Sequence, residues 1–205
     1  MTDIKEQVKE IKQSFRQMMD GAVAKSMRDK GLSYKLNWGA TLPRLREKAD
    51  AYGKNYDLAI ALWKEDVREC KILATMIMPA DQVLPEVIDI WMEQITSQEI
   101  AEQAVFNLFQ HLPYAPEKAY TWMASDQELY QYCGFHILAR LFMEKREPNE
   151  RGINEFLDQA LAALQGKSLG VRKAAMAAVR RFSELGLVYE RLAKSALKQV
   201  HLDFL

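Results

Sequence analysis

The feature that most constrains this chain is a short pattern that recurs four times along it. Each occurrence has a polar start, then a β-branched or leucine residue, and then a small residue about four positions later. The anchor residues are Val67, Ile100, Leu129 and Val171, which lie 33, 29 and 42 residues apart. Spacings of this size are typical of proteins built from stacked two-helix repeats. The recurrence predicts a helical solenoid, and a plain helical bundle is the alternative that could show a similar pattern by chance.

The composition points to helices and loops. Only 9 glycines and 6 prolines occur among the 205 residues, and strong helix formers such as alanine, leucine, glutamate and lysine dominate. No segment alternates apolar and polar residues over the length that a half-buried strand needs. We therefore expect an all-α fold, a superhelical solenoid of helix pairs, organised as a single domain over residues 1–205.

Apolar periodicity and chain breaks place the expected helices. Ile4, Val8, Ile11 and Phe15 recur at helical spacing, which predicts a first helix running to about Arg28. A second helix is expected from Leu42-Pro43 to Gly53, because proline suits a first helical turn. The remaining helices are expected over residues 56–63, 67–78, 84–95, 100–111, 115–124, 129–145, 153–164, 171–185 and 189–201.

Several classes of protein are disfavoured by the sequence. The two cysteines, Cys70 and Cys133, form no Cys-x-x-Cys motif, which indicates a reducing compartment without a disulfide framework. The first residues lack the apolar core of a secretory signal, and the longest apolar run is too short to cross a bilayer. We expect a cytoplasmic protein without membrane contact. The three histidines are widely spaced and no acid-rich ligand cluster accompanies them, so neither a metal nor another cofactor is expected.

The charge is balanced overall but unevenly distributed. Residues 1–80 carry a net charge of +4, residues 81–158 of −9 and residues 159–205 of +5. The acidic middle would repel phosphates, so we expect it either to face away from a nucleic acid or to bind a basic protein partner.

Two stretches of basic side chains are candidates for phosphate contact. Lys173 and Arg180 are seven residues apart and share one helical stripe, and Arg172 lies about a third of a turn away. A basic stripe opposite an apolar one suits phosphate binding, and a solvated helix face is the alternative. Arg68 and Lys71 form a comparable, weaker stripe in an earlier repeat.

Two separated motifs resemble the AlkD-like DNA alkylation repair family. They are Asn37-Trp-Gly-Ala-Thr-Leu-Pro-Arg-Leu-Arg-Glu-Lys-Ala and Leu62-Trp-Lys-Glu-Asp-Val-Arg-Glu-Cys-Lys-Ile-Leu-Ala. The stretch Val171-Arg-Lys-Ala-Ala-Met-Ala-Ala-Val-Arg is similar to the last inner helix of that family. The resemblance covers about residues 32–185. It implies a superhelix of HEAT-like repeats whose concave basic face holds duplex DNA, and active members that excise cationic alkylated purines without a metal.

The resemblance also implies positions for the active site. Active members carry a tryptophan and an aspartate four residues apart on one inner helix, and an arginine on the next. The matching positions here hold Gln98 and Glu102, with Glu99 at a second acid position and Tyr132 at the arginine position. A carboxylate could stabilise a developing oxocarbenium ion, but the indole and guanidinium are replaced. Trp38, in a loop, is the indole that we expect to contact a ligand.

Three functional hypotheses follow. The first is a relative of the repair family that binds DNA, with duplex DNA as the expected ligand, and whose glycosylase site is degraded or altered. The second is an active glycosylase for N3- and N7-alkylpurines that uses Glu102, with Glu99 beside it. The third is a helical scaffold that binds protein partners through its acidic middle repeats.

Overall fold

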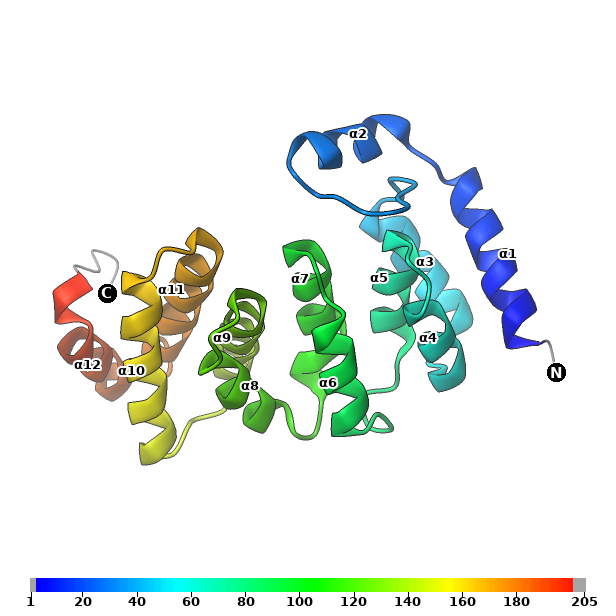
Figure 1. The fold of residues 1–205 in the computed structure, drawn as a ribbon. Helices are drawn as coiled ribbons and strands as arrows, with labels where there is room; N and C mark the ends of the chain where they lie inside the picture. Colours follow the sequence, from blue (N-terminus) through cyan, green and yellow to red (C-terminus); the bar gives the residue numbers. More distant parts are fainter. Residues whose placement is uncertain (1–2, 201–205) are drawn as a thin grey trace. The chain divides into compact units, whose positions relative to one another are not determined.

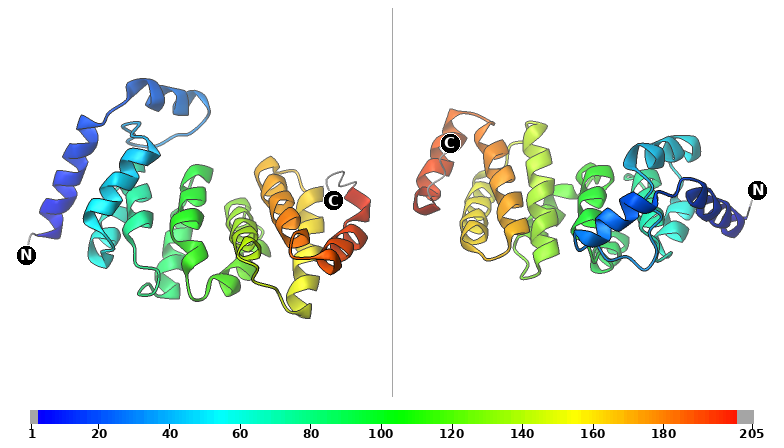
Figure 2. Two further views of the ribbon diagram at one scale, coloured as in Figure 1. Left: turned by 180° about the vertical axis from the view of Figure 1, so that it is seen from behind. Right: turned by 90° about the horizontal axis from the view of Figure 1, so that it is seen from above.

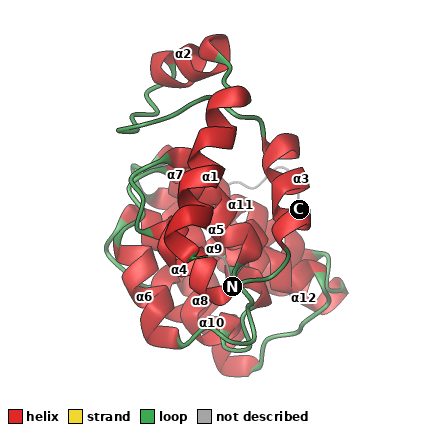
Figure 3. Cartoon of the chain, turned by 90° about the vertical axis from the view of Figure 1, so that its right-hand side faces the viewer, coloured by secondary structure: helices red, strands yellow, loops and turns green. Residues whose placement is uncertain are grey.

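The computed structural model describes residues 3–200, and throughout this part of the chain the regular elements are helices (Figure 3). The α-helices are α1 (Ile4–Gln17), α2 (Gly21–Asp29), α3 (Leu42–Tyr52), α4 (Tyr56–Trp63), α5 (Arg68–Ile77), α6 (Pro85–Glu93), α7 (Gln98–Asn107), α8 (Ala115–Met123), α9 (Glu128–Met143), α10 (Glu150–Gln165), α11 (Leu169–Ser183) and α12 (Leu187–Ala196). Two short 3-10 helices, η1 (Phe109–His111) and η2 (Lys198–Val200), complete the described elements. The prediction of an all-α fold is confirmed.

The chain divides into two compact units, Met1–Leu108 and Phe109–Leu205. In the first unit α5 packs between α3 and α7, while α4 covers α5 and α1 lies against α4 (Figure 1). In the second unit α9 packs against α11, with α8 on α9 and with α10 and α12 on α11 (Figure 2). The expectation of a single domain stays a prediction.

We call α3, α5, α7, α9 and α11 the inner-row helices, because within each unit they pack on one another in order. The helices α4, α6, α8, α10 and α12 are called the outer helices. The four recurring anchors all belong to the inner row. Val67 is the N-cap residue of α5, and Ile100, Leu129 and Val171 lie in α7, α9 and α11. The recurring pattern therefore marks one helix of each pair, as predicted.

The first predicted helix is wrong in its extent, because the chain turns between α1 and α2. The Asp20 side chain accepts hydrogen bonds from the backbone N–H groups of Ala22 and Val23, which makes it the N-cap of a new helix. The backbone N–H of Asp20 also donates to the carbonyl of Trp38 at 2.9 Å. The apolar stripe that is buried on α1 ends at Phe15, so nothing requires the helix to continue to Arg28.

The other helices lie close to their predicted places. The bounds of α4 agree with the prediction over residues 56–63. The predicted helix 100–111 is divided, because α7 ends at Asn107 and residues 109–111 form η1. The helix predicted from residue 153 begins three residues earlier, where Asn149 accepts a hydrogen bond from the N–H of Gly152. The helix predicted over residues 189–201 begins two residues earlier and is shorter, because α12 ends at Ala196 and η2 follows at Lys198–Val200; residue 201 itself lies outside the described residues.

Two glycines allow backbones to approach closely. A Cβ atom on Gly134 would lie 2.4 Å from the backbone nitrogen of Met123, so α8 and α9 pack too tightly for any side chain there. Gly39 has a φ of +75°, and a Cβ atom on it would lie 2.2 Å from the carbonyl oxygen of Asp20. The absence of a side chain at Gly39 thus allows the loop before α3 to pack directly against the backbone at the start of α2.

Candidate nucleic-acid interface

The helix α7 carries Gln98, Glu99 and Glu102, three of the residues that the resemblance to the repair family predicts at active-site positions. Ser97 caps the helix by accepting a hydrogen bond from the backbone N–H of Ile100 at 3.2 Å. Gln98 and Glu102 are exposed, one turn apart, while Glu99 is half-buried on the neighbouring face. Among the residues that the structure describes, Glu102 has no hydrogen-bond or ion-pair partner. The two glutamates are therefore in different environments.

Glu99 is held by two residues from other elements. Its carboxylate accepts hydrogen bonds from Nε and Nη2 of Arg68, at 2.9 and 2.6 Å, and a further one from the Tyr34 hydroxyl. Burial alone would raise the pKa of Glu99, but the hydrogen bonds from Arg68 and Tyr34 outweigh it and hold the pKa below its usual value. Burial, reinforced by the bond to Glu99, raises the pKa of Tyr34. Glu99 is thus an ionised structural partner of a buried guanidinium.

Arg68 does not present a free charge to a ligand. Its side chain is 1% exposed, and it also donates to the carbonyl of Ala40 at 3.0 Å and to Glu69 at 3.3 Å. Glu69 in turn accepts hydrogen bonds from the backbone N–H groups of Trp38 and Ala40, each at 3.2 Å. This burial argues against the predicted phosphate contact, because the guanidinium is enclosed by carboxylates and backbone. The Arg68-Glu69 pair instead ties the loop at residues 38–40 to α5.

Lys71 is also engaged within the fold. Its Nζ donates to the carbonyl of Trp63 at 2.7 Å and lies 4.6 Å from the centre of the Trp63 ring. That ring stacks on Trp91, with centroids 4.2 Å apart and an interplanar angle of 5°. Burial lowers the pKa of Lys71. Lys71 thus caps the carboxyl end of α4 and lies over the Trp63 ring. Its role in DNA binding stays a prediction.

Trp38, which we predicted to contact a ligand, is largely buried. Trp38 is 8% exposed, and its ring packs against Phe15 with centroids 5.9 Å apart. Only its edge reaches a surface hollow beside α1, which it lines together with Leu36. The ring therefore contributes to a fixed wall and does not stand out as an open stacking platform.

Sequence reasoning missed an aromatic residue one turn after Glu102 and the cation that packs on it. Phe106, one turn after Glu102 on α7, is 38% exposed. The guanidinium carbon of Arg46, on α3, lies 5.6 Å from the centre of the Phe106 ring, which is cation–π geometry. The two residues are 60 positions apart, so no local pattern brought them together. The i, i+4 spacing of Glu102 and Phe106 was the available signal.

Tyr132 belongs to the second unit and lies in its core. It is 5% exposed, and its ring centroid is 4.3 Å from that of His136. Burial, followed by the nearby charge of Arg140, lowers the pKa of His136 to about 4. A phenol in this setting cannot provide the bidentate contact of a guanidinium.

The basic side chains of α11 share one exposed surface, which we call the α11 basic face. It consists of Arg172, Lys173 and Arg180, all exposed, while Val171, Ala175, Ala178 and Phe182 are buried on the other side. Arg180 lies 3.5 Å from Glu184, but its side chain remains 69% exposed. Within the described residues Arg172 and Lys173 have no carboxylate partner. The structure thus places the predicted stripe on an inner-row helix, open to solvent.

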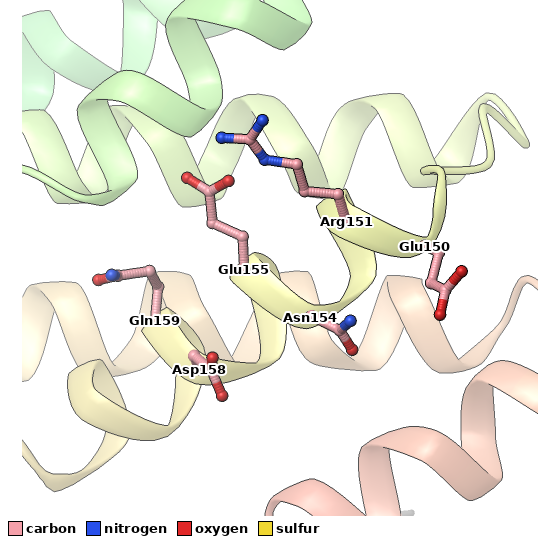
Figure 4. Close-up of a pocket in the computed structure, with 6 residues that line it drawn as sticks. All are labelled: Glu150, Arg151, Asn154, Glu155, Asp158 and Gln159. Carbon is pink, nitrogen blue, oxygen red and sulfur yellow. The ribbon is translucent and has the colours of Figure 1, made fainter.

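The acidic middle of the chain is carried mainly by outer helices. Half of the fourteen acidic residues between positions 81 and 158 lie on α6, α8 and α10, and only three lie on inner-row helices. Figure 4 shows the α10 part of this surface, where Glu155 points to one side of the helix and Glu150 and Asp158 to the other. All six residues that line this depression belong to α10, so it is an open helix surface.

Residues 3–200 contain no group of three or more histidine, cysteine, aspartate or glutamate side chains arranged to hold a metal ion. None of the helices in this range has the length and apolarity needed to cross a membrane.

Comparison with known proteins bears on the identity of the chain. One solved structure, described as "A new family of proteins related to the HEAT-like repeat DNA glycosylases with affinity for branched DNA structures", matches with a TM-score of 0.82 at 15% sequence identity. The match covers 94% of this chain and 82% of the other, so the two share the HEAT-like repeat fold. Curated proteins give no match. The family model for "DNA alkylation repair enzyme" matches residues 11–187, and the chain belongs to that family.

Proposed function

We propose that this protein binds DNA through its inner-row helices and that it excises alkylated bases weakly or not at all. The observation that carries the proposal is the α11 basic face, where Arg172, Lys173 and Arg180 are exposed on an inner-row helix. Phosphates bind most strongly where unpaired cations are grouped on one surface. Family membership and a fold neighbour described as having affinity for branched DNA support the same function.

The distribution of acids agrees with this proposal. Outer helices carry Glu86, Asp89 and Glu93 on α6, and Glu150, Glu155 and Asp158 on α10. A polyanion approaching the inner-row helices of either unit would therefore meet few of the acids that make the middle of the chain negative. We infer that the acidic surface serves solubility and orientation on DNA.

The proposed loss of excision rests on two replaced positions. Gln98 cannot offer an aromatic face to a cationic base, and the buried phenol of Tyr132 cannot clamp a phosphate. Each lost charge-stabilising contact lowers catalysis by about 10²–10³-fold. With both contacts missing, we expect no measurable release of methylated purines.

DNA binding is tested by fluorescence anisotropy with a linear duplex and a four-way junction of matched sequence, each at two salt concentrations. Phosphate contacts predict an affinity that falls steeply with salt. We expect Arg172→Glu/Lys173→Glu to weaken binding at least tenfold. The matched control, Arg146→Glu/Arg191→Glu, reverses two exposed charges outside α11, one in the loop before α10 and one on α12, and should stay within twofold of the wild type. Absence of binding at low salt would instead favour a protein-binding scaffold that uses the acidic outer helices.

Excision by Glu102 is the second candidate, and the neighbouring Phe106 and Arg46 favour it. Phe106 lies one helical turn after Glu102 on α7, and the Arg46 guanidinium lies over the Phe106 ring, so an aromatic ring and a cation are available on this part of the surface. Chromatography of bases released from methylated DNA separates the candidates. Release that disappears in Glu102→Gln would establish the glycosylase and overturn our first proposal, while binding without release supports it.

A further inference from the structure

A second basic surface lies on α1, at the start of the first unit. Lys5, Lys9, Lys12 and Arg16 occupy positions i, i+4, i+7 and i+11, so their side chains form one stripe about 16 Å long. The neighbouring stripe of α1, about a quarter of a turn away, is buried and consists of Val8, Ile11 and Phe15. Figure 1 shows α1 at the edge of its unit, beside α4.

These side chains border a hollow of about 370 Å³, which we call the α1 hollow. Leu36, the edge of Trp38 and Val8 provide its apolar wall, and Glu65 is its one acidic side chain. Four basic residues against one acidic residue leave the hollow with a net positive charge. Its volume falls within the range of small-ligand sites.

Two of the four cations are without an acidic partner. Lys12 pairs with Glu65 at 2.6 Å, and Lys9 pairs with Glu6 at 3.3 Å in an exposed contact. In the described part of the chain, Lys5 and Arg16 have no ion pair, and both are exposed. They lie at opposite ends of the stripe. An anion that spans the hollow could therefore bind both without breaking an existing pair.

The apolar wall is held in place by the surrounding fold. The Trp38 ring packs on Phe15, and its backbone N–H donates to the buried Glu69 at 3.2 Å. Leu36 is 39% exposed, and its carbonyl accepts a hydrogen bond from the backbone N–H of Arg68 at 3.0 Å. Leu36 therefore offers an apolar contact at a fixed position, and the neighbouring cations offer a contact to negative charge. A ligand that combines a flat apolar part with a negatively charged part would use both.

Phosphates joined to flat, partly apolar bases are the repeating units of a nucleic acid. Surfaces for single strands combine a basic track for the backbone with apolar or aromatic contacts to unpaired bases. A duplex presents its phosphates but keeps its base faces stacked, so it could use the cations and not the wall. The combination of stripe and wall favours a single strand.

We propose that the α1 hollow binds single-stranded DNA, with backbone phosphates on Lys5 and Arg16 and one unpaired base against Leu36 and the edge of Trp38. This inference rests on the proposed DNA-binding function and deepens it. It gives the protein a site for an unpaired strand in addition to the α11 basic face.

The test measures anisotropy of a labelled oligothymidylate and of a linear duplex with the full chain. Lys5→Glu/Arg16→Glu should lower affinity for the single strand at least tenfold and reduce the salt slope by about 1.4, the value for two single-strand phosphate contacts. The affinity of this variant for the duplex should fall less than its affinity for the single strand, because the duplex also has the α11 basic face and makes no contact with the apolar wall. The matched control Lys25→Glu/Lys30→Glu, two exposed lysines at α2, should leave single-strand affinity within twofold.

The base contact is tested separately with Leu36→Ser and an abasic oligonucleotide of equal length. The variant should bind oligothymidylate about three- to tenfold more weakly and the abasic strand as wild type does. Equal effects on both strands, or none, would overturn the base contact. Competition by polyglutamate as effective as that by the oligonucleotide would overturn the assignment to DNA.

The outcomes for the two proposals can be told apart. If the wild type binds neither single strands nor duplexes, the proposed function itself fails. If duplex binding is lost in Arg172→Glu/Lys173→Glu while single-strand binding is unchanged in Lys5→Glu/Arg16→Glu, the inference about the α1 hollow fails and the proposed function stands.

Discussion

Removing the guanidinium of Arg68 should destabilise the fold strongly. Its side chain is 1% exposed and donates four hydrogen bonds, two to Glu99, one to Glu69 and one to the carbonyl of Ala40. In Arg68→Met these acceptors lose their donor, and two carboxylates remain uncompensated in or near the core. Breaking a buried pair in this way costs about 3–5 kcal/mol. That is a large fraction of the stability of a typical domain.

The measurement is urea unfolding followed by far-ultraviolet circular dichroism. The control is Arg180→Met, which removes an arginine whose side chain is 69% exposed in its pair with Glu184. Surface pairs contribute at most about 1 kcal/mol, so this variant should unfold close to the wild type. A second variant, Arg68→Met/Glu99→Met, removes both partners and should recover part of the loss, because no unpaired charge is left between them.

The same network predicts a dependence on pH. The pKa of Glu99 is held below its usual value, so its ionised form stabilises the folded state above the unfolded pKa of about 4.3. That contribution is lost as the pH falls through the lower, folded pKa. The loss on acidification should shrink in Arg68→Met, where the main hydrogen-bond donor to Glu99 is gone.

One result would refute the reasoning. If Arg68→Met unfolded within about 1 kcal/mol of the wild type and bound DNA more weakly, Arg68 would be a phosphate contact and not a structural residue. A destabilised variant that keeps its DNA affinity below its unfolding transition would confirm the structural role.

Two further predictions concern the second unit. Gly134→Ala should cost about 1–3 kcal/mol in urea unfolding, because its Cβ atom would lie 2.4 Å from the backbone of Met123, whereas Gly21→Ala, with no atom within 4 Å, should cost little. The lowered pKa of His136, about 4 against about 6.5 when unfolded, means that stability is fully present above pH 6.5 and declines as the pH falls towards 4. This decline should be at most about 1.4 kcal/mol per pH unit. It should be absent in His136→Asn, and an equal decline in the variant would contradict the assignment.

Much of the fold could be predicted from local patterns. The recurring anchors identify inner-row helices because a repeat needs an apolar residue and a small one at the same place in each copy. The bounds of α4 follow from Asn55, which caps it, and from its apolar run. The turn at Asp20 was missed because the apolar spacing continues through Met18. The capping side chain of Asp20 is a local signal, but its backbone contact with Trp38 depends on a loop 18 residues away.

The site was predictable only in part, for a similar physical reason. The α11 basic face lies within one helix, and the seven-residue spacing of Lys173 and Arg180 was enough to predict it. Arg68 looked like a surface cation because two of its partners, Glu99 and the carbonyl of Ala40, lie 31 and 28 positions away in the sequence. The same holds for Arg46 and Phe106, which only the packing of α3 and α7 beside α5 brings together.

The stacking order of the helices has a consequence for how the chain folds. In the second unit α8 packs on α9, and α11 packs on α9, α10 and α12, so each of these partners is either the next helix in sequence or the one after it. Chains dominated by such short-range contacts close small loops and cross low entropic barriers. Folding can begin at any helix pair and spread to the next. The second unit should therefore fold on the microsecond-to-millisecond timescale that is typical of helical proteins with low contact order.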